Sequence, residues 1–135
     1  MTKEEIFDLI KDAGYCILAT IEQNKPKARP MMPCLTEDGE LLLACLAHCR
    51  TINQIKNNPN VELCYLDRMM RFARVSGKAA LSENKERKEY VWNNIPMLRQ
   101  YFIGPDDTNF ILVVIKIENI EVMTPQQRDP QSITL

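Results

Sequence analysis

The stretch CRTINQIKNNPNVELCYLD, residues 49–67, contains a helix pattern and a strand pattern on either side of one proline. The helix opens with Arg50 and Thr51 and ends before Pro59, which has no backbone N–H to continue it. The strand follows over residues 61–67. A helix start presents unpaired N–H groups and a partial positive charge, so Arg50 and Thr51 form either an ordinary cap or an anion-binding corner.

Helix and strand patterns follow one another irregularly along the rest of the chain. Thr2 and Glu5 form a capping box for a helix over residues 2–13, which Gly14 ends. Apolar, β-branched and alternating runs predict further strands over residues 15–22, 40–47, 71–81 and 110–123. Residues 83–93 are expected to form a helix. Residues 95–107 are expected to form a short helix or turn followed by a loop.

Residues 27–35 are extended but contain two prolines, Pro30 and Pro33. Each proline removes a donor from a strand ladder. We therefore expect an edge strand, a bulged strand or a strand that faces a ligand instead of a neighbour.

The order of these elements indicates the fold class. Strands come in consecutive runs and not in strict alternation with helices, which argues against a parallel doubly wound sheet. We expect a mainly β protein, with about six antiparallel strands in a barrel or open barrel and short helices at one end. Residues 1–124 form one domain, and the tail 125–135 has little to bury and is expected to be mobile or swapped onto a partner.

Composition excludes several classes of function. The 135 residues carry 17 Lys and Arg against 18 Asp and Glu, so there is no basic excess for binding nucleic acid. No signal peptide and no apolar run of about 20 residues is present, so we expect no membrane partner. The five cysteines are odd in number, and free thiols in a reducing cytoplasm are the simplest interpretation.

Cys45, His48 and Cys49 resemble a metal site at first sight. Zinc requires four ligands, there is no second ligand pair, and His48 is the only histidine of the chain, so we expect no metal. A Cys–His pair without further context is also weak evidence for nucleophilic catalysis, and no catalytic residue is predicted. No glycine-rich phosphate loop is present.

The remaining candidates are cations and aromatic side chains scattered along the chain. Arg29, Arg50 and Lys78 could serve a phosphate, and Trp92, Tyr101 and Phe102 offer flat apolar surface. Together they contain what a phosphorylated planar cofactor needs.

Four stretches carry a resemblance to a known family: LATIEQNKPKARPMMP, CRTINQIKNNPNVELCYLD, RVSGKAAL and WNNIPMLRQYFIGPDD. In their order and spacing they resemble the pyridoxamine 5′-phosphate oxidase-like, FMN-binding split β-barrel proteins, particularly the general-stress-protein branch. The resemblance runs from residue 17 to about residue 124 and implies a homodimer with two FMN sites at the subunit interface.

The resemblance also implies site residues. Arg29, Pro30 and Met31 would lie along the isoalloxazine ring, and Leu46 and Ala47 beside the ribityl chain. The phosphate end would be formed by Cys49, Arg50 and Thr51, with His48 beside them. The partner subunit would cover the site with Trp92, Tyr101 and Phe102.

The phosphate end departs from the family pattern of a hydroxyl residue, then Arg, then Lys. Here Cys49 stands in the hydroxyl position and Thr51 in the lysine position, so one cation is missing. A charge-assisted hydrogen bond contributes roughly 1.5–3 kcal/mol, about ten- to a hundredfold in affinity. Retention of FMN at this altered corner is therefore the open question.

Three functions remain at this point, the third of which is a dimer whose cofactor site has decayed. The first is an FMN-dependent oxidoreductase acting on a small molecule, in which the flavin carries the chemistry. The second is a non-catalytic flavin- or haem-binding protein on the same fold, a sensor or store, with His48, a Cys or a Tyr as axial haem ligand.

Overall fold

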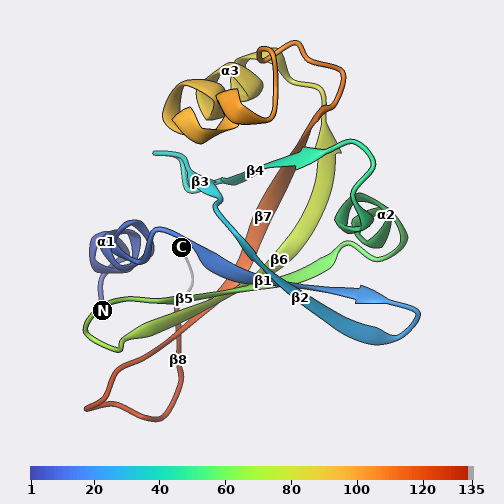
Figure 1. The fold of residues 1–135 in the computed structure, drawn as a ribbon. Coiled ribbons are helices and arrows are strands. Elements are labelled where there is room, and N and C mark those ends of the chain that lie inside the picture. Colours follow the sequence, from blue (N-terminus) through green and yellow to red (C-terminus); the bar gives the residue numbers. More distant parts are fainter. Residues whose placement is uncertain (134–135) are drawn as a thin grey trace.

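A computed structural model describes residues 1–133, in which every strand belongs to one antiparallel sheet (Figure 1). The sheet order is β2-β1-β5-β6-β7-β4-β3, with β8 added to β7. The strands are β1 (Cys16–Glu22), β2 (Lys25–Met31), β3 (Cys34–Leu35), β4 (Leu41–Leu46), β5 (Asn60–Leu66), β6 (Phe72–Ser82), β7 (Phe110–Met123) and β8 (Gln131–Ile133).

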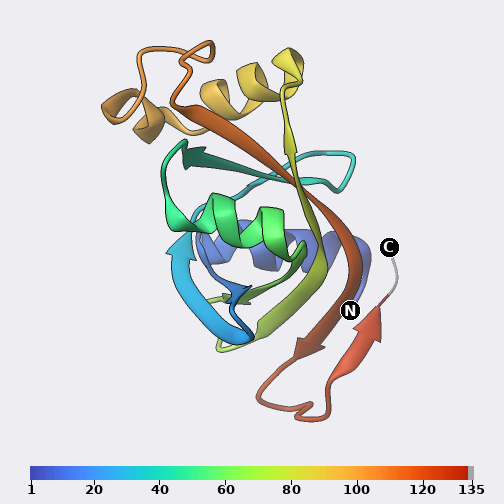
Figure 2. The same ribbon diagram turned by 90° about the vertical axis from the view of Figure 1, so that its right-hand side faces the viewer.

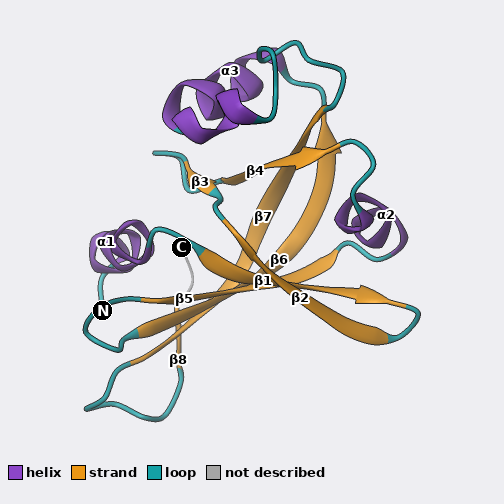
Figure 3. Ribbon diagram, in the orientation of Figure 1, coloured by secondary structure: helices purple, strands orange, loops and turns teal. Residues whose placement is uncertain are grey.

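Short helices lie against this sheet in three places (Figure 3). They are α1 (Lys3–Ala13), α2 (Arg50–Asn57) and α3 (Lys85–Asn94), the last followed by the 3₁₀ helix η1 (Pro96–Gln100). The predicted capping box is confirmed at α1, where the Thr2 hydroxyl accepts from the Glu5 N–H and the Glu5 carboxylate accepts from the Thr2 N–H. Gly14 ends this helix with a φ of 78°, a conformation that favours glycine.

The long strands β6 and β7 connect the two halves of the molecule. In Figure 1 they run from the half that contains β1, β2 and β5 to the half that contains β3, β4 and α3. Their register shifts between Ser76 and Gly77, where a β-bulge bends the pair. A Cβ atom at Gly77 would lie 2.2 Å from the Lys116 carbonyl oxygen, so this crossing requires glycine.

The core has two parts. The larger cluster lies between one face of the sheet and helices α1 and α2, and includes Leu9, Leu18, Ile55 and Leu63. The smaller cluster packs under α3 and η1 around Leu42, Val91, Leu98, Phe110 and Leu112. Figure 2 shows the corresponding layers, with α1 and α2 at mid-height and α3 with η1 at one end.

The expected mainly β antiparallel fold is confirmed, with three differences in detail. The part of the chain that the structure describes contains eight strands where about six were expected. The predicted extended segment 27–35 is interrupted at Met32 and Pro33, where β2 ends and β3 begins. Of the three alternatives expected for this segment, β2 is the edge strand. The tail is not free of the sheet, because β8 pairs with β7 in the register Ile120↔Ile133, and only residues 134–135 lie outside the described part.

None of the helices among residues 1–133 is long and apolar enough to span a bilayer.

Candidate functional site

The N-terminus of α2 forms one end of the candidate site. Cys49 is the N-cap residue, in extended conformation, and its side chain makes no cap hydrogen bond. Thr51 is 8% exposed. Among residues 1–133 the buried side-chain atoms without a hydrogen-bond partner are Tyr65 Oη and Arg74 Nε, and the Thr51 hydroxyl is not one of them. This end of α2 therefore presents a threonine hydroxyl together with the free N–H groups of a helix start.

An apolar groove of about 280 Å³ begins at this helix end, and we call it the α2 groove. Strand β4 supplies its floor, β2 supplies Met31, and the segment after η1 supplies an aromatic wall. The full lining is Met31, Ala44, Cys45, Leu46, Cys49, Thr51, Leu98, Tyr101 and Phe102. Six of these nine were predicted as cofactor-binding residues: Met31, Leu46, Cys49, Thr51, Tyr101 and Phe102.

The aromatic wall comes from the same chain. Phe102 is 6% exposed and stacks on Phe110, with ring centroids 5.1 Å apart, whereas Tyr101 is 59% exposed. The family resemblance implied that Tyr101 and Phe102 cover the site of a partner subunit. The structure places both against the β4 and α2 residues of their own chain.

A polar network occupies the other side of α2. Glu22, at the end of β1, accepts from Arg50 Nη2 at 2.9 Å and from Gln54 Nε2 at 2.6 Å. The Gln54 carbonyl oxygen accepts from the Thr20 hydroxyl at 2.5 Å and from Arg29 Nη2 at 2.6 Å. The hydrogen bond from Gln54 and the bond from Arg50 hold the pKa of the Glu22 carboxyl below its usual range.

The two predicted arginines therefore do not line the α2 groove. Arg29 donates to the Leu18 carbonyl at 3.2 Å as well as to Gln54, and burial lowers the pKa of its guanidinium. Arg50 lies in a separate polar cleft of about 490 Å³ between α2 and the β1–β2 turn, with Glu22 and Gln54 in its lining. The reason is electrostatic, because Glu22 attracts Arg50 to that side of the helix.

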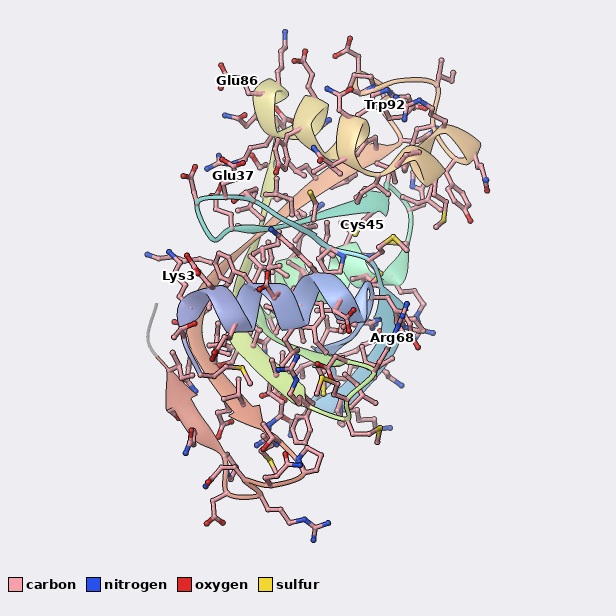
Figure 4. The ribbon with its side chains drawn as sticks, turned by 90° about the vertical axis from the view of Figure 1, so that its left-hand side faces the viewer. Lys3, Glu37, Cys45, Arg68, Glu86 and Trp92 are labelled. Carbon is pink, nitrogen blue, oxygen red and sulfur yellow. The ribbon has the colours of Figure 1, made fainter. Side chains whose placement is uncertain are left out.

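The other predicted residues lie at or beyond the rim of the groove. Pro30 is exposed on β2, and Ala47 and His48 form the turn between β4 and α2, where the Ala47 N–H donates to the Asn109 carbonyl. Trp92 lies on α3, apart from Cys45 on β4 (Figure 4). Its ring packs against the smaller core cluster under the Arg99 guanidinium, 4.8 Å from the ring centroid, so it forms no part of the groove wall.

Thiols are the main titratable groups of the α2 groove. Burial raises the pKa of the Cys45 thiol to about 12, so it stays protonated at neutral pH. Cys49 lies at the surface end of the same groove and is half-buried. Within residues 1–133 no three His, Cys, Asp or Glu side chains are grouped so that they could hold a metal ion.

Several residues of the site were not predicted from sequence. Gln54 was missed, although it is a polar residue 4% exposed on the buried face of α2, and its position between Ile52 and Ile55 on that face is the signal that could have identified it. Glu22 gave no such signal, because it lies 32 residues from Gln54 and 28 from Arg50.

Comparison with known proteins decides the family. The family described as "Pyridoxamine 5′-phosphate oxidase like" matches residues 1–131. The chain belongs to the pyridoxamine 5′-phosphate oxidase-like family. The family expected from the sequence is therefore confirmed.

Two relatives place the chain beside a branch of this family. It is 28% identical to General stress protein 26 of Bacillus subtilis (strain 168), over 98% of this chain and 96% of that protein. The crystal structure of General Stress Protein 26 from Bacillus anthracis str. Sterne superposes with a TM-score of 0.83 at 29% identity, covering 98% of both chains.

Two more distant structures of the pyridoxamine 5′-phosphate oxidase-like fold are informative about ligands. An FMN-binding protein related to pyridoxamine 5′-phosphate oxidase, from Nostoc punctiforme PCC 73102, has a TM-score of 0.75 at 16% identity, covering 98% of this chain and 96% of that one. A haem-binding protein from Mycobacterium smegmatis has a TM-score of 0.79 at 14% identity, covering 93% of this chain and 55% of that one. Proteins of this fold thus include both flavin- and haem-binding neighbours.

Proposed function

We propose that this protein is an FMN-binding flavoprotein whose ring site is the α2 groove. The observation that carries the proposal is the convergence of six predicted cofactor residues on one apolar groove that ends at the unsatisfied N-terminus of α2. Apolar walls with a few polar groups at one end are typical of cofactor sites.

The residues fit the parts of FMN unevenly. Met31, Leu46 and Tyr101 would lie against the ring, and the Thr51 hydroxyl with the α2 N–H groups would meet the phosphate. Arg50 is the cation nearest to that end in sequence, but Glu22 pairs with it. We therefore expect a flavin site that is strong for the ring and weak for the phosphate.

A second subunit would complete the site. The α2 groove holds about 280 Å³, just below the range of about 300–1,000 Å³ typical of small-molecule pockets, so one chain encloses a flavin only in part. We propose that the protein is a homodimer and that its partner covers the open side of the groove.

An exposed apolar sheet face is the candidate dimer surface. The residues of β1, β2 and β5 that point away from α1 and α2 include paired apolar neighbours on adjacent strands. We call Ile17, Ala19, Ala28, Pro30 and Cys64 the outer sheet face. Pro30 of this face directly precedes Met31 of the groove, so the two residues point to opposite sides of edge strand β2.

The proposed reaction is electron transfer between small molecules. When bound, FMN supplies hydride and electron chemistry that no side chain offers. The lining of the α2 groove contains no carboxylate, lysine or histidine, so the chain's own residues would bind and orient the flavin and exclude water. The five free cysteines favour a reducing cytoplasm as the compartment.

The test is an absorbance spectrum of the purified protein followed by an FMN titration monitored by flavin fluorescence. We expect saturable quenching at one FMN per chain, and bleaching of the flavin bands by a nicotinamide donor. Absence of binding at FMN concentrations of tens of micromolar would refute the flavoprotein proposal. Binding without reduction by any nicotinamide donor would limit the protein to flavin storage or sensing.

Haem is the second candidate ligand. Cys49 and Tyr101 are side chains of types that ligate haem iron, and both line the α2 groove, with His48 in the adjoining turn. Titration with haemin distinguishes this alternative, because axial ligation produces a shifted Soret band. Loss of that shift in Cys49→Ser or Tyr101→Phe would identify the ligand.

A further inference from the structure

Two of the five cysteines lie at the two ends of the connection between β4 and α2. Cys45 is the next-to-last residue of β4, and Cys49 is the N-cap residue of α2. The Cys49 N–H donates to the Leu46 carbonyl at 3.0 Å, which closes a tight turn between the two elements. Both cysteines line the α2 groove, and their thiols form a hydrogen bond with each other. The turn therefore brings two thiols into contact in one groove.

The two thiols differ in access. Cys45 is 4% exposed, burial raises the pKa of its thiol to about 12, and the charge and hydrogen bond of Cys49 add to the rise. The hydrogen bond has this effect because Cys45 donates its own proton in it. Cys49 is half-buried at the surface end of the groove and makes no cap hydrogen bond with α2. A reagent from solution therefore reaches Cys49 first, while Cys45 keeps its proton behind it.

A fixed guanidinium acts on both thiols. Arg29 donates to the Leu18 carbonyl at 3.2 Å and to Gln54 at 2.6 Å, so its position is set by the fold. Burial lowers the pKa of this guanidinium, and Cys49 and Cys45 act in the opposite direction. The same attraction works against the burial of Cys45 and lowers the pKa of its thiol. The positive charge thus favours loss of the proton that Cys45 must give up to form an S–S bond.

The other cysteines are not paired in this way among residues 1–133. Cys16 and Cys64 lie on the adjacent strands β1 and β5, but Cys64 is opposite Ile17, so the two thiols point to opposite sides of the sheet. Cys34 belongs to the smaller core cluster and does not line the α2 groove.

We propose that Cys45 and Cys49 form a dithiol–disulfide site that exchanges with low-molecular-weight disulfides such as oxidised glutathione. The Cys49 thiolate attacks one sulfur of the small disulfide, forms a mixed disulfide and releases one small thiol. Cys45 then loses its proton and attacks Cys49 Sγ, which forms the Cys45–Cys49 bond and releases the second small thiol. The protein dithiol is oxidised by two electrons, and one small disulfide is reduced to two thiols. This chemistry needs no flavin and stands apart from the proposed function.

The experiment exposes the ligand-free protein, verified by its absorbance spectrum, to oxidised glutathione at neutral pH. Acid quenching and alkylation with N-ethylmaleimide in urea then label every remaining thiol before tryptic digestion. One peptide, residues 28–50, carries Cys34, Cys45 and Cys49, because Pro30 blocks cleavage after Arg29. We expect this peptide to lose two hydrogen atoms and to keep one label, at Cys34, and we expect reduced glutathione to restore all three labels. Any reaction of the remaining cysteines is read on other peptides.

Substitutions assign a role to each sulfur. Cys45→Ala should stop at the mixed disulfide, with glutathione attached to Cys49, because no second thiol is present to release it. Cys49→Ser should lose no thiol from the same peptide. Cys34→Ser removes another buried thiol outside the groove, so it is the matched control and should form the Cys45–Cys49 bond like the wild-type protein.

The wild-type protein decides the proposal by itself, so a variant that fails to fold leaves the test intact. A stable mixed disulfide at Cys49, or no oxidation of either cysteine, would overturn the dithiol site. A bond that forms only in urea, or that joins Cys34 to either residue, would overturn it as well, because the proposal requires the native contact between Cys45 and Cys49.

Discussion

Thr51 lies in the first turn of α2 beside the free N–H groups of the helix start, lines the α2 groove and is 8% exposed. In the proposed flavin site its hydroxyl is the polar side-chain group that would meet the phosphate. The residue can therefore serve a ligand or only the local fold.

Thr51→Val separates these two roles, because valine has nearly the same shape without the hydroxyl. We expect the melting temperature of the apoprotein to be unchanged or higher, since no bond is lost. FMN affinity should fall by about three- to tenfold, the equivalent of one neutral hydrogen bond of about 1 kcal/mol. Thr51→Ser, which keeps the hydroxyl, should bind like the wild-type protein, and a loss of affinity in Thr51→Ser alone would contradict the assignment.

The cysteines differ in environment and therefore in expected reactivity. Cys16 and Cys45 are buried, and burial raises the pKa of each thiol to about 12, so almost no thiolate exists at neutral pH. Cys64 is exposed on β5, and Cys49 is half-buried at the α2 groove.

Native-state alkylation with iodoacetamide at pH 7.5, read by peptide mass spectrometry, tests this difference. We expect Cys49 to be modified first in the native protein, and Cys64 to become reactive when the proposed dimer dissociates, because it lies on the outer sheet face. Cys16 and Cys45 should be modified only after unfolding in urea. Saturating FMN should protect Cys49, and modification of Cys49 at an unchanged rate with FMN bound would mean that the ligand lies elsewhere.

At the scale of elements, the bulge between β6 and β7 determines how the two halves of the molecule meet. The register passes from Ser76↔Asn119 to Gly77↔Ile117, which leaves Glu118 without a partner residue. Because both strands continue past the bulge, its bend positions β4 and therefore the floor of the α2 groove.

Gly77→Ala should disrupt this crossing. The added Cβ would meet the Lys116 carbonyl oxygen at 2.2 Å, so the strands must separate, and we expect a loss of about 2–3 kcal/mol in the free energy of unfolding. Urea unfolding measures the loss. Gly104→Ala is the matched control, because nothing lies within 4 Å of its added Cβ, and it should change stability by less than about 0.5 kcal/mol. Equal stability of the two variants would show that the bulge adapts.

At the scale of the whole molecule, the sheet has one covered face and one uncovered face. Helices α1 and α2 pack on the inner side of β1, β5 and β6, whereas the outer sheet face has no helix over it (Figures 1 and 2). Ile17 is 41% exposed there, opposite Pro30 on β2 and Cys64 on β5. Apolar clusters of this kind on a sheet surface are typical of interfaces.

Ile17→Lys tests the dimer proposal through the mass in solution, measured by light scattering after size-exclusion chromatography. We expect the wild-type protein to be a dimer and Ile17→Lys to shift toward the monomer with weaker FMN binding, because a buried charge opposes association. Met69→Lys, at a residue 68% exposed in the β5–β6 turn, should remain dimeric. A wild-type monomer that binds FMN tightly would refute a site shared between subunits.

Patterns within the chain predicted the mainly β class, the capped helix at Thr2 and, as one of three alternatives, the edge position of β2, and the resemblance of four stretches predicted the family. These depend on local patterns of capping, turn residues and apolar spacing, which act over a few neighbouring residues. The resemblance indicated six groove residues, of which Leu46, Cys49 and Thr51 are close in sequence because β4, residues 47–49 and α2 follow each other directly.

The partners of the charged groups follow from contacts between distant parts of the chain. Strand β1 lies between β2 and β5, which brings Thr20 and Glu22 beside Gln54 and turns Arg29 and Arg50 away from the α2 groove. The tail gains partners only because the far end of β7 is free to pair with β8. In each case a polar or backbone group takes the nearest available partner in space, and that partner is set by sheet order and not by sequence spacing.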